Sequence, residues 1–185
     1  MALIKGDMET NFEVRTFDVA ISPEEFAELP KNPIYIILDN LRSAFNVGSI
    51  FRLSDTMRVE GLYLCGYTAY PPHPKLDKTS LGTIPFVQWK HFDTTIDAVK
   101  ELQSKGIEVW AAETTSHSVS YPEAQPKGPI ALVFGNEALG VSDEVMAQCD
   151  GLIEIPTFGY KNSLNVATSC SVLGYAMLEK LGKLS

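Results

Sequence analysis

The 185-residue sequence has no apolar stretch that approaches the ~20 residues of a membrane-spanning helix. Its start, MALIKGDMETNFEVR, carries acidic residues and no apolar core of the kind found in signal peptides. These absences predict a cytoplasmic protein with no membrane segment. A hydrophobic fraction of 45% with 21% charged residues argues against disorder, and the length predicts one globular domain.

The sequence also lacks the cysteine and histidine spacings of metal sites. Its three cysteines are an odd number spread far apart, in segments with strand or helix patterns, which favours buried reduced thiols over disulfides (Cys65, Cys149, Cys170). The three histidines, His73, His91 and His117, form no HxxxH pair and have no CxxC beside them. We therefore expect no metal.

Basic residues are scarce, with 15 Lys and Arg against 23 Asp and Glu and a net charge of −8. This balance argues at first against nucleic acid, because phosphate binding depends on clustered bases. Residues 40–90 nevertheless hold six basic and three acidic residues, so one face could still be positive. A solvated acidic surface with scattered lysines is the other reading.

Apolar periodicity predicts alternating strands and helices, an α/β order. The expected strands are continuous apolar runs, which are typical of a parallel sheet covered on both faces (Ile34 to Leu38, Gly61 to Cys65, Ile107 to Glu113, Ile130 to Phe134, Leu152 to Ile155). The expected helices lie between and after them (Asn46 to Met57, Thr95 to Lys105, Ser142 to Gln148, Ser163 to Leu181).

The chain divides into residues 1–32, an N-terminal extension, and residues 33–185, the domain. SPEEFAEL, from Ser22, has a Ser cap, Pro at the first helical position and Glu at the third, so it predicts a short helix in the extension. Two proline-rich pieces, YPPHPKLDK at 70–78 and YPEAQPKGP at 121–129, are expected to be loops.

Polar residues follow three of the predicted strands, and an α/β sheet binds ligands at the carboxyl ends of its strands. FGNEALG follows the fourth strand, but GxGxxG and the phosphate-loop pattern are both absent, which excludes the commonest nucleotide-phosphate motifs. IPTFGYKNSLNVATS follows the fifth strand; there Ser163 could simply be a helix N-cap and Asn165 a polar first-turn residue. DNLRSAFNVGSIFRLSD follows the first strand, and its Arg52 could merely reach solvent or pair with Asp55.

Three ordered motifs resemble the SpoU/TrmH branch of the SPOUT superfamily, S-adenosylmethionine-dependent RNA ribose 2′-O-methyltransferases. The motifs are NLRSAFNVGSIFRLSD, LVFGNEALGVSDEV and IEIPTFGYKNSLNVATSCSVLGYAML, and with the intervening segments they span roughly residues 34–182. The resemblance implies a SPOUT-type α/β knot, a deep trefoil in the C-terminal part of a mostly parallel sheet flanked by helices. It also implies a homodimer. The apolar side of the last helix could serve either the core or that interface.

The resemblance further implies the site residues. Gly135, Ile155 and Leu164, with Thr114 as a weaker candidate, would hold S-adenosylmethionine, Gly135 by letting the backbone approach it. Arg52 matches the family's catalytic residue, either as a base or, because arginine stays protonated, as a stabiliser of developing negative charge or of an adjacent phosphate. The remaining polar motif positions would support it: Asn46, Glu137, Ser163 and Asn165.

The expected partner is RNA, with tRNA favoured over rRNA because the separate RNA-binding domain of many family members is missing from this sequence. Lys78 to Gly82, together with His73 and Lys75, is the candidate RNA face; an exposed proline-rich loop is the alternative. Other functions stay open: a knot that binds RNA or protein without catalysis, a methyltransferase for a small molecule or protein, and a base methyltransferase.

Overall fold

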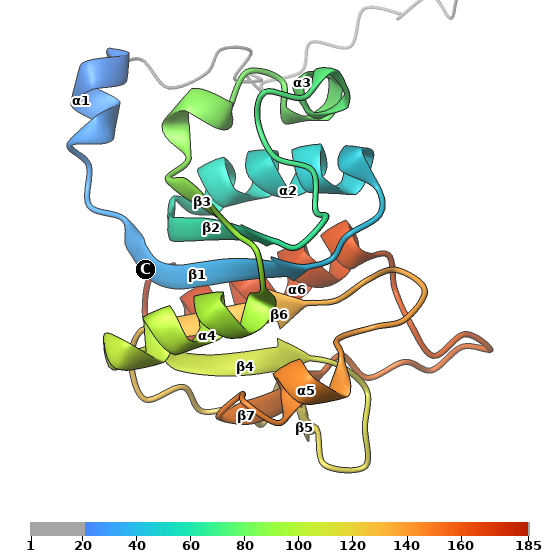
Figure 1. The fold of residues 1–185 in the computed structure, drawn as a ribbon. Helices are drawn as coiled ribbons and strands as arrows, with labels where there is room; N and C mark the ends of the chain where they lie inside the picture. Colours follow the sequence, from blue (N-terminus) through green and yellow to red (C-terminus); the bar gives the residue numbers. More distant parts are fainter. Residues whose placement is uncertain (1–20, 185) are drawn as a thin grey trace, which may run out of the picture.

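The computed structural model describes residues 21–184, which form one parallel sheet with helices on both faces (Figure 1). In chain order the elements are α1 (Pro23–Ala27), β1 (Asn32–Asp39), α2 (Ala44–Met57), β2 (Val59–Cys65), α3 (Pro74–Ser80), the 3-10 helix η1 (Ile84–Phe86), β3 (Trp89–Phe92), α4 (Thr95–Ser104), β4 (Glu108–Ala112), β5 (Val119–Ser120), β6 (Ile130–Phe134), α5 (Asp143–Met146), β7 (Gly151–Glu154) and α6 (Val166–Lys180).

The strands have the order β3-β2-β1-β6-β4-β7-β5, and every neighbouring pair is parallel. The central strands β1 and β6 pair in register from Ile34 with Ile130 to Leu38 with Phe134. All five residues of β6 are buried, as a central strand covered on both faces requires. The sequence prediction of a mostly parallel sheet flanked by helices is confirmed; the trefoil knot stays a prediction.

Side chains that alternate along β1 and β6 build two separate hydrophobic cores. Ile36 and Leu132 point to the side covered by α2, α3 and α6, whereas Ile37 and Val133 point to the side covered by α4 and α5. In Figure 1, α4 and α5 lie in front of the strands and α6 lies behind them. The apolar side of α6 belongs to the first core (Cys170, Leu173, Met177, Leu178).

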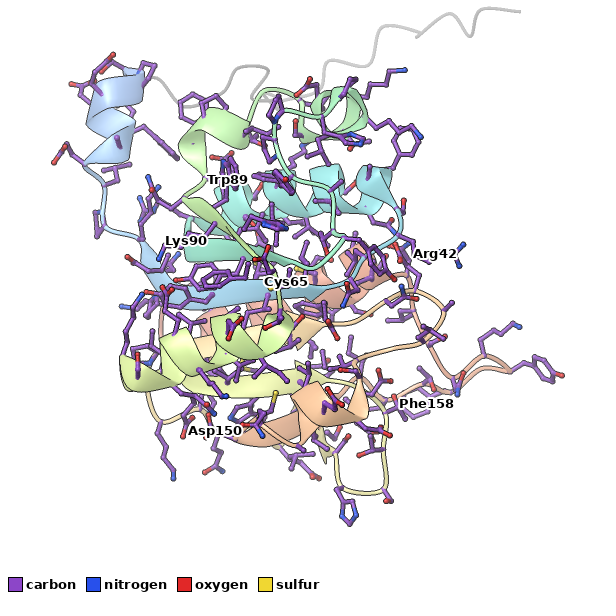
Figure 2. All side chains as sticks on the ribbon, in the orientation of Figure 1. Arg42, Cys65, Trp89, Lys90, Asp150 and Phe158 are labelled. Carbon is purple, nitrogen blue, oxygen red and sulfur yellow. The ribbon has the colours of Figure 1, made fainter. Side chains whose placement is uncertain are left out.

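Each of the five predicted strands is present, with bounds that shift by at most a few residues. The long C-terminal helix, however, begins at Val166 and not at Ser163, so the prediction of its start was wrong. The loop between β7 and α6 continues through residue 165 and extends away from the sheet, with Phe158 on it (Figure 2). The prediction for residues 121–129 as a connection without a helix or strand agrees with the structure.

The proline-rich segment at 70–78 is not wholly a loop, because α3 begins at Pro74. Proline is compatible with the first helical position, where its missing N–H is not needed, and His73 caps the helix by accepting from the backbone N–H of Lys75 at 3.2 Å. The short strands β3 and β5 are at the two edges of the sheet and were not predicted.

The predicted short helix before the first strand is α1, with the full capping box formed by Ser22 and Glu25. It contacts η1 through an edge-to-face pair of Phe26 and Phe86, with ring centroids 5.6 Å apart. Residues 1–20, the rest of the predicted N-terminal extension, lie outside the described residues. The division of the chain into an extension and a domain stays a prediction.

All three cysteines carry free thiols; Cys65 and Cys170 are buried and Cys149 is half-buried. Figure 2 shows Cys65 in the interior, at the end of β2. Burial raises the pKa of both Cys65 and Cys149 to about 12. Between residues 21 and 184 no helix has the length and apolarity to cross a bilayer, and no group of three or more His, Cys, Asp or Glu is placed to hold a metal.

Candidate active site

A cavity of about 430 Å³ opens where β4, β6 and β7 end. These three strands are neighbours and parallel, so their carboxyl ends meet at one edge of the sheet. Residues 135–140 after β6 and residues 162–166, which lead into the first residue of α6, complete the wall. The volume falls within the roughly 300–1,000 Å³ of small-molecule sites.

The four residues predicted to bind a cofactor all line this cavity. Thr114 follows β4, Gly135 follows β6, Ile155 follows β7, and Leu164 comes just before α6. The structure therefore brings together residues that are up to 50 positions apart in the sequence.

Three carboxylates line the cavity, those of Glu113, Glu137 and Glu154, and the described residues contribute no Lys or Arg to its wall. Glu113 accepts hydrogen bonds from the backbone N–H groups of Thr114 at 3.1 Å and Val141 at 3.0 Å. Carboxylates without a basic counterpart attract cations and repel phosphates. The electrostatics of the cavity therefore suit a ligand that carries positive charge.

The loop after β6 is held by the side chain of Asn136, which is 6% exposed. Its amide oxygen accepts from the N–H groups of Ala138 at 2.9 Å and Leu139 at 3.1 Å. Its amide nitrogen donates to the carbonyl of Asn40 at 2.8 Å and to the hydroxyl of Tyr67 at 2.6 Å. The first two contacts shape the loop itself, and the two with Asn40 and Tyr67 fix it against the body of the protein, so the position of the next residue, Glu137, is defined.

Asn46, Glu137 and Asn165 form a continuous chain of hydrogen bonds. The amide of Asn46 donates to Glu137 Oε1 at 2.8 Å, and the amide of Asn165 donates to Asn46 Oδ1 at 3.2 Å. The pairs are separated by 91 and 119 residues in the sequence. Each of these residues belongs to a different one of the three motifs, so the three motifs meet at this set of hydrogen bonds.

Glu137 also fixes the start of α2. Its carboxylate accepts from the backbone N–H groups of Arg42 at 2.8 Å and Ser43 at 3.1 Å, the residues that precede this helix. A carboxylate there interacts favourably with the positive end of the helix. Glu137 thus orients α2, while no ion pair joins it to Arg52 among the described residues.

The pKa of Glu137 reflects these contacts. Partial desolvation alone would raise it, but the N–H groups of Arg42 and Ser43 and the amide of Asn46 stabilise the ionised form and lower the pKa below its usual value. Glu137 is therefore an acceptor at neutral pH, not a proton donor.

We expect Glu137→Gln to remove a pH-dependent part of the stability. The pKa of Glu137 is lower in the folded protein than in the unfolded chain. As the pH falls, the unfolded chain therefore takes up the proton at a higher pH than the folded protein does. The contribution of Glu137 is thus present above about pH 4.5 and is lost as the pH falls through the folded-state value. Urea unfolding at about pH 6 and about pH 4 should show the difference between wild type and variant narrowing at the lower pH. A difference that widens on acidification would contradict this assignment.

Asn165 is the N-cap of α6, a role that the sequence alternatives gave to Ser163. Its amide oxygen accepts from the N–H groups of Ala167 at 2.9 Å and Thr168 at 3.3 Å. The same side chain donates to Asn46, so it caps α6 and joins it to α2 in one contact. Ser163 lines the cavity two residues before the cap, and the N-cap reading for it was wrong.

Arg52 lies outside the cavity. Its exposed side chain lines a second hollow, of about 590 Å³, between α2, α3 and the start of α6. We call this the Arg52 hollow; its wall is formed by Ser49, Arg52, Leu53, Thr56, Lys78, Thr79, Leu81, Ala167, Thr168 and Ser171. The alternative of a pair between Arg52 and Asp55 stays open.

The candidate RNA residues His73, Lys75 and Lys78 lie on or next to α3. Lys75 and Lys78 are both exposed, but only Lys78 lines the Arg52 hollow. The sequence placed both lysines on the candidate RNA face, whereas in the structure Lys78 alone of the two lines the Arg52 hollow.

Sequence reasoning assigned no role to Glu113 or Asn136. Glu113 is the last residue of the predicted strand Ile107 to Glu113, next to Thr114, and that position was a usable signal. Asn136 stands between Gly135 and Glu137, but its burial and its contacts with Asn40 and Tyr67 depend on pairing between distant segments.

A parallel sheet covered on both faces, with an acidic cavity at its strand ends, defines an α/β protein with a small-ligand site. Within that class the chain belongs to the SpoU rRNA methylase family, whose model matches residues 33–175. This confirms the resemblance to the SpoU/TrmH branch.

Three known proteins illustrate the relationship. A protein of Staphylococcus haemolyticus, assigned by name to the TrmH family of tRNA/rRNA methyltransferases, is 31% identical over 145 residues; the match covers 78% of this chain and 58% of the relative. A structure determined for the 2-OH methylation of C/U34 on tRNA is similar with a TM-score of 0.69 and 26% identity, covering 83% of this chain and 98% of that one. The SpoU methyltransferase AviRb of Streptomyces viridochromogenes, in complex with AdoMet, shares the fold with a TM-score of 0.74 at 22% identity, covering 84% and 63%.

Proposed function

We propose that this protein transfers a methyl group from S-adenosylmethionine to a ribose 2′-hydroxyl of RNA, with tRNA favoured over rRNA. The chain spans only 58% of the length of its staphylococcal relative, so the proposal rests mainly on the site in this chain.

The observation that carries the proposal is the hydrogen-bond chain of Asn46, Glu137 and Asn165. It places polar groups of all three motifs together beside the cavity, and it connects α2, which bears Arg52, to α6. A site that aligns a hydroxyl for in-line attack needs fixed polar groups near both reactants, because alignment supplies much of the rate. A protein that only bound RNA would not need such a connection.

The cavity fits S-adenosylmethionine. Its wall offers apolar side chains for an adenine (Ile153, Ile155, Leu164, Leu173) and backbone groups at three strand ends. Its carboxylates suit the positive charge of a sulfonium (Glu113, Glu137, Glu154). When bound, the cofactor supplies an activated methyl group. The residues of this chain that would hold it are Thr114, Gly135, Ile155 and Leu164, and the related AviRb structure contains AdoMet.

The reaction also requires removal of the hydroxyl proton and stabilisation of the developing negative charge on the oxygen. Arg52 is the candidate catalytic residue, and its permanent charge favours charge stabilisation over literal proton abstraction. Asn46 and Asn165 would position α2 and α6 around the ribose, and Ser163 would line the same site. Glu137 would act through Asn46 as a positioning residue.

The choice of tRNA is supported by the structure related to C/U34 methylation, which matches this chain over nearly its own full length.

We also propose a homodimer. Three apolar side chains on or near α2 and α6 are partly exposed, at 48%, 45% and 39% (Phe45, Leu164, Tyr175), and α2 packs on α6. Light scattering that gives the mass of one chain, 20.3 kDa, would contradict the dimer. The cytoplasmic location stays a prediction.

The test is transfer of labelled methyl from S-adenosylmethionine to unmodified tRNA and, separately, to rRNA, followed by alkaline hydrolysis. A 2′-O-methyl group blocks cleavage at its own 3′ phosphate. We therefore expect label in alkali-resistant dinucleotides from tRNA.

Other outcomes would redirect the proposal. Label in mononucleotides would indicate base methylation. Cofactor binding without transfer to either RNA would indicate a non-RNA substrate, and absence of both binding and transfer would indicate a non-catalytic knot. Label from rRNA alone would overturn the preference for tRNA.

A further inference from the structure

Tyr67 presents an aromatic ring to solvent at the edge of the sheet where the strands end. It follows the last residue of β2 by two positions, and its exposed fraction is 62%. Tyr70, on the same loop, packs its ring on those of His91 and Trp89, with centroids 4.3 and 6.4 Å apart. No aromatic ring of the described residues packs on Tyr67 in this way. Of the two tyrosines, Tyr67 is therefore the one whose ring can receive a partner.

This exposed side chain is nevertheless held at both ends. Its hydroxyl accepts a hydrogen bond from the amide of Asn136 at 2.6 Å, and its backbone N–H donates to the side-chain carbonyl of Asn40 at 3.2 Å. The next residue, Thr68, is buried, and its hydroxyl donates to the carbonyl of Leu38 at 3.2 Å. A ring that is already fixed in one orientation loses little conformational entropy when a ligand packs on it.

The anchor of Tyr67 belongs to the candidate active site. Asn136 lines the cavity at the strand ends, and the next residue, Glu137, accepts from the amide of Asn46. The hydroxyl of Tyr67 is thus connected to the set of polar groups that would surround the reacting ribose. Because a base is attached directly to its ribose, a ribose held beside Asn46 has its base close to Tyr67.

The charge of the cavity wall favours the base over the other parts of a nucleotide at this place. The wall contains three carboxylates and, among the described residues, no Lys or Arg, so it repels a phosphate. An uncharged base is not repelled. Proteins commonly bind unpaired RNA bases by stacking them on aromatic side chains, and this contact depends on the face of the ring and not on charge.

We propose that the ring of Tyr67 is the stacking surface for the base of the nucleotide whose ribose is methylated. This inference rests on the proposed function and adds a requirement to it. The target base must have one face free of its neighbours, as bases in RNA loops do, whereas a base within a continuous helix has both faces covered. The hydroxyl of Tyr67 orients the ring through Asn136, and the ring makes the contact with RNA.

The test compares Tyr67→Ala with Tyr67→Phe, using the RNA that wild type methylates, unmodified tRNA or rRNA. For Tyr67→Ala we expect the dissociation constant to rise about 5- to 150-fold, the usual effect of losing one stack between a base and an aromatic ring. The slope of log K against log salt should stay that of wild type, because no phosphate contact is lost. Tyr67→Phe keeps the ring and should retain most of the affinity, although it lacks the hydroxyl that accepts from Asn136.

Tyr70→Ala is the matched control, since it removes a tyrosine ring from the same loop, but one that packs on the protein itself. It should retain the RNA affinity of wild type. Thermal unfolding of all three variants checks that the fold is intact.

Three results would overturn the stacking site while the proposed function stands. Equal losses in Tyr67→Phe and Tyr67→Ala would show that Tyr67 acts only by holding Asn136. Unchanged affinity in Tyr67→Ala, or a shallower salt slope, would exclude a contact with a base. A smaller mass of Tyr67→Ala by light scattering would show that a second copy of the chain covers the ring. If wild type neither binds nor methylates RNA, the proposed function fails and this inference fails with it.

Discussion

Replacing Arg52 by alanine should reduce methyl transfer to RNA by about 10²–10³-fold, the usual loss when a group that stabilises developing negative charge is removed. Binding of S-adenosylmethionine should not change, because Arg52 lines the hollow between α2, α3 and α6 and not the cavity at the strand ends. Single-turnover rates measure the first quantity, and calorimetric titration of the cofactor measures the second.

Two controls make this result interpretable. Arg58→Ala removes the same charge just after the end of α2, at a residue that lines neither the cavity nor the Arg52 hollow, and should retain most of the activity. Arg52→Lys keeps the charge but loses the planar fork, so an intermediate rate is expected. Full methyl transfer by Arg52→Ala would remove Arg52 from the site, and loss of cofactor binding would show that it acts at the cavity instead.

The sheet was predictable because its central strands are uninterrupted apolar runs. Ile130 to Phe134 is fully buried and has the predicted bounds. The edges were not predictable: β5 has two residues and β3 has four with no buried position, so neither gives an apolar run. The helix α3 was not predicted for two reasons. The prolines of its segment indicated a loop, and its N-cap is a histidine and not one of the usual polar cap residues.

The residues of the candidate site were proposed from the sequence, but their hydrogen-bond partners could not be predicted from it. Glu137, expected to support Arg52, holds the start of α2 and the amide of Asn46. Asn165, expected to support Arg52 with a polar first-turn residue as the alternative, is a cap that also contacts Asn46. Such contacts join segments about 100 residues apart and depend on strand order, which local periodicity does not encode.

Gly135 illustrates the same limit. The resemblance implied that this glycine lets a cofactor approach the backbone, and the residue does line the cavity. The nearest atoms to an added Cβ, however, are backbone atoms of Gly140 and Val141, too close for any side chain. The need for glycine at this position therefore comes first from the loop, which closes on itself through paired hydrogen bonds between Asn136 and Gly140 at 3.1 and 2.8 Å.

We therefore expect Gly135→Ala to have the second largest effect. Its Cβ would push against the backbone at Gly140 and Val141, and a backbone cannot rotate away as a flexible side chain can. The loop would have to move, and it carries both Asn136 and Glu137. Overpacking of this kind costs about 1–3 kcal/mol of stability. Affinity for S-adenosylmethionine should fall at least about tenfold, since the loop forms one wall of the cavity.

The matched control is Gly159→Ala, on the loop before α6, where an added Cβ meets nothing within 4 Å. Neither Gly135 nor Gly159 has the positive φ that favours glycine, so the two substitutions differ in steric contact and not in backbone preference. Denaturant unfolding and cofactor titration on both variants separate the two effects. If Gly135→Ala binds the cofactor as wild type does, the loop adapts without loss, and its closure on Gly140 is not what shapes the site.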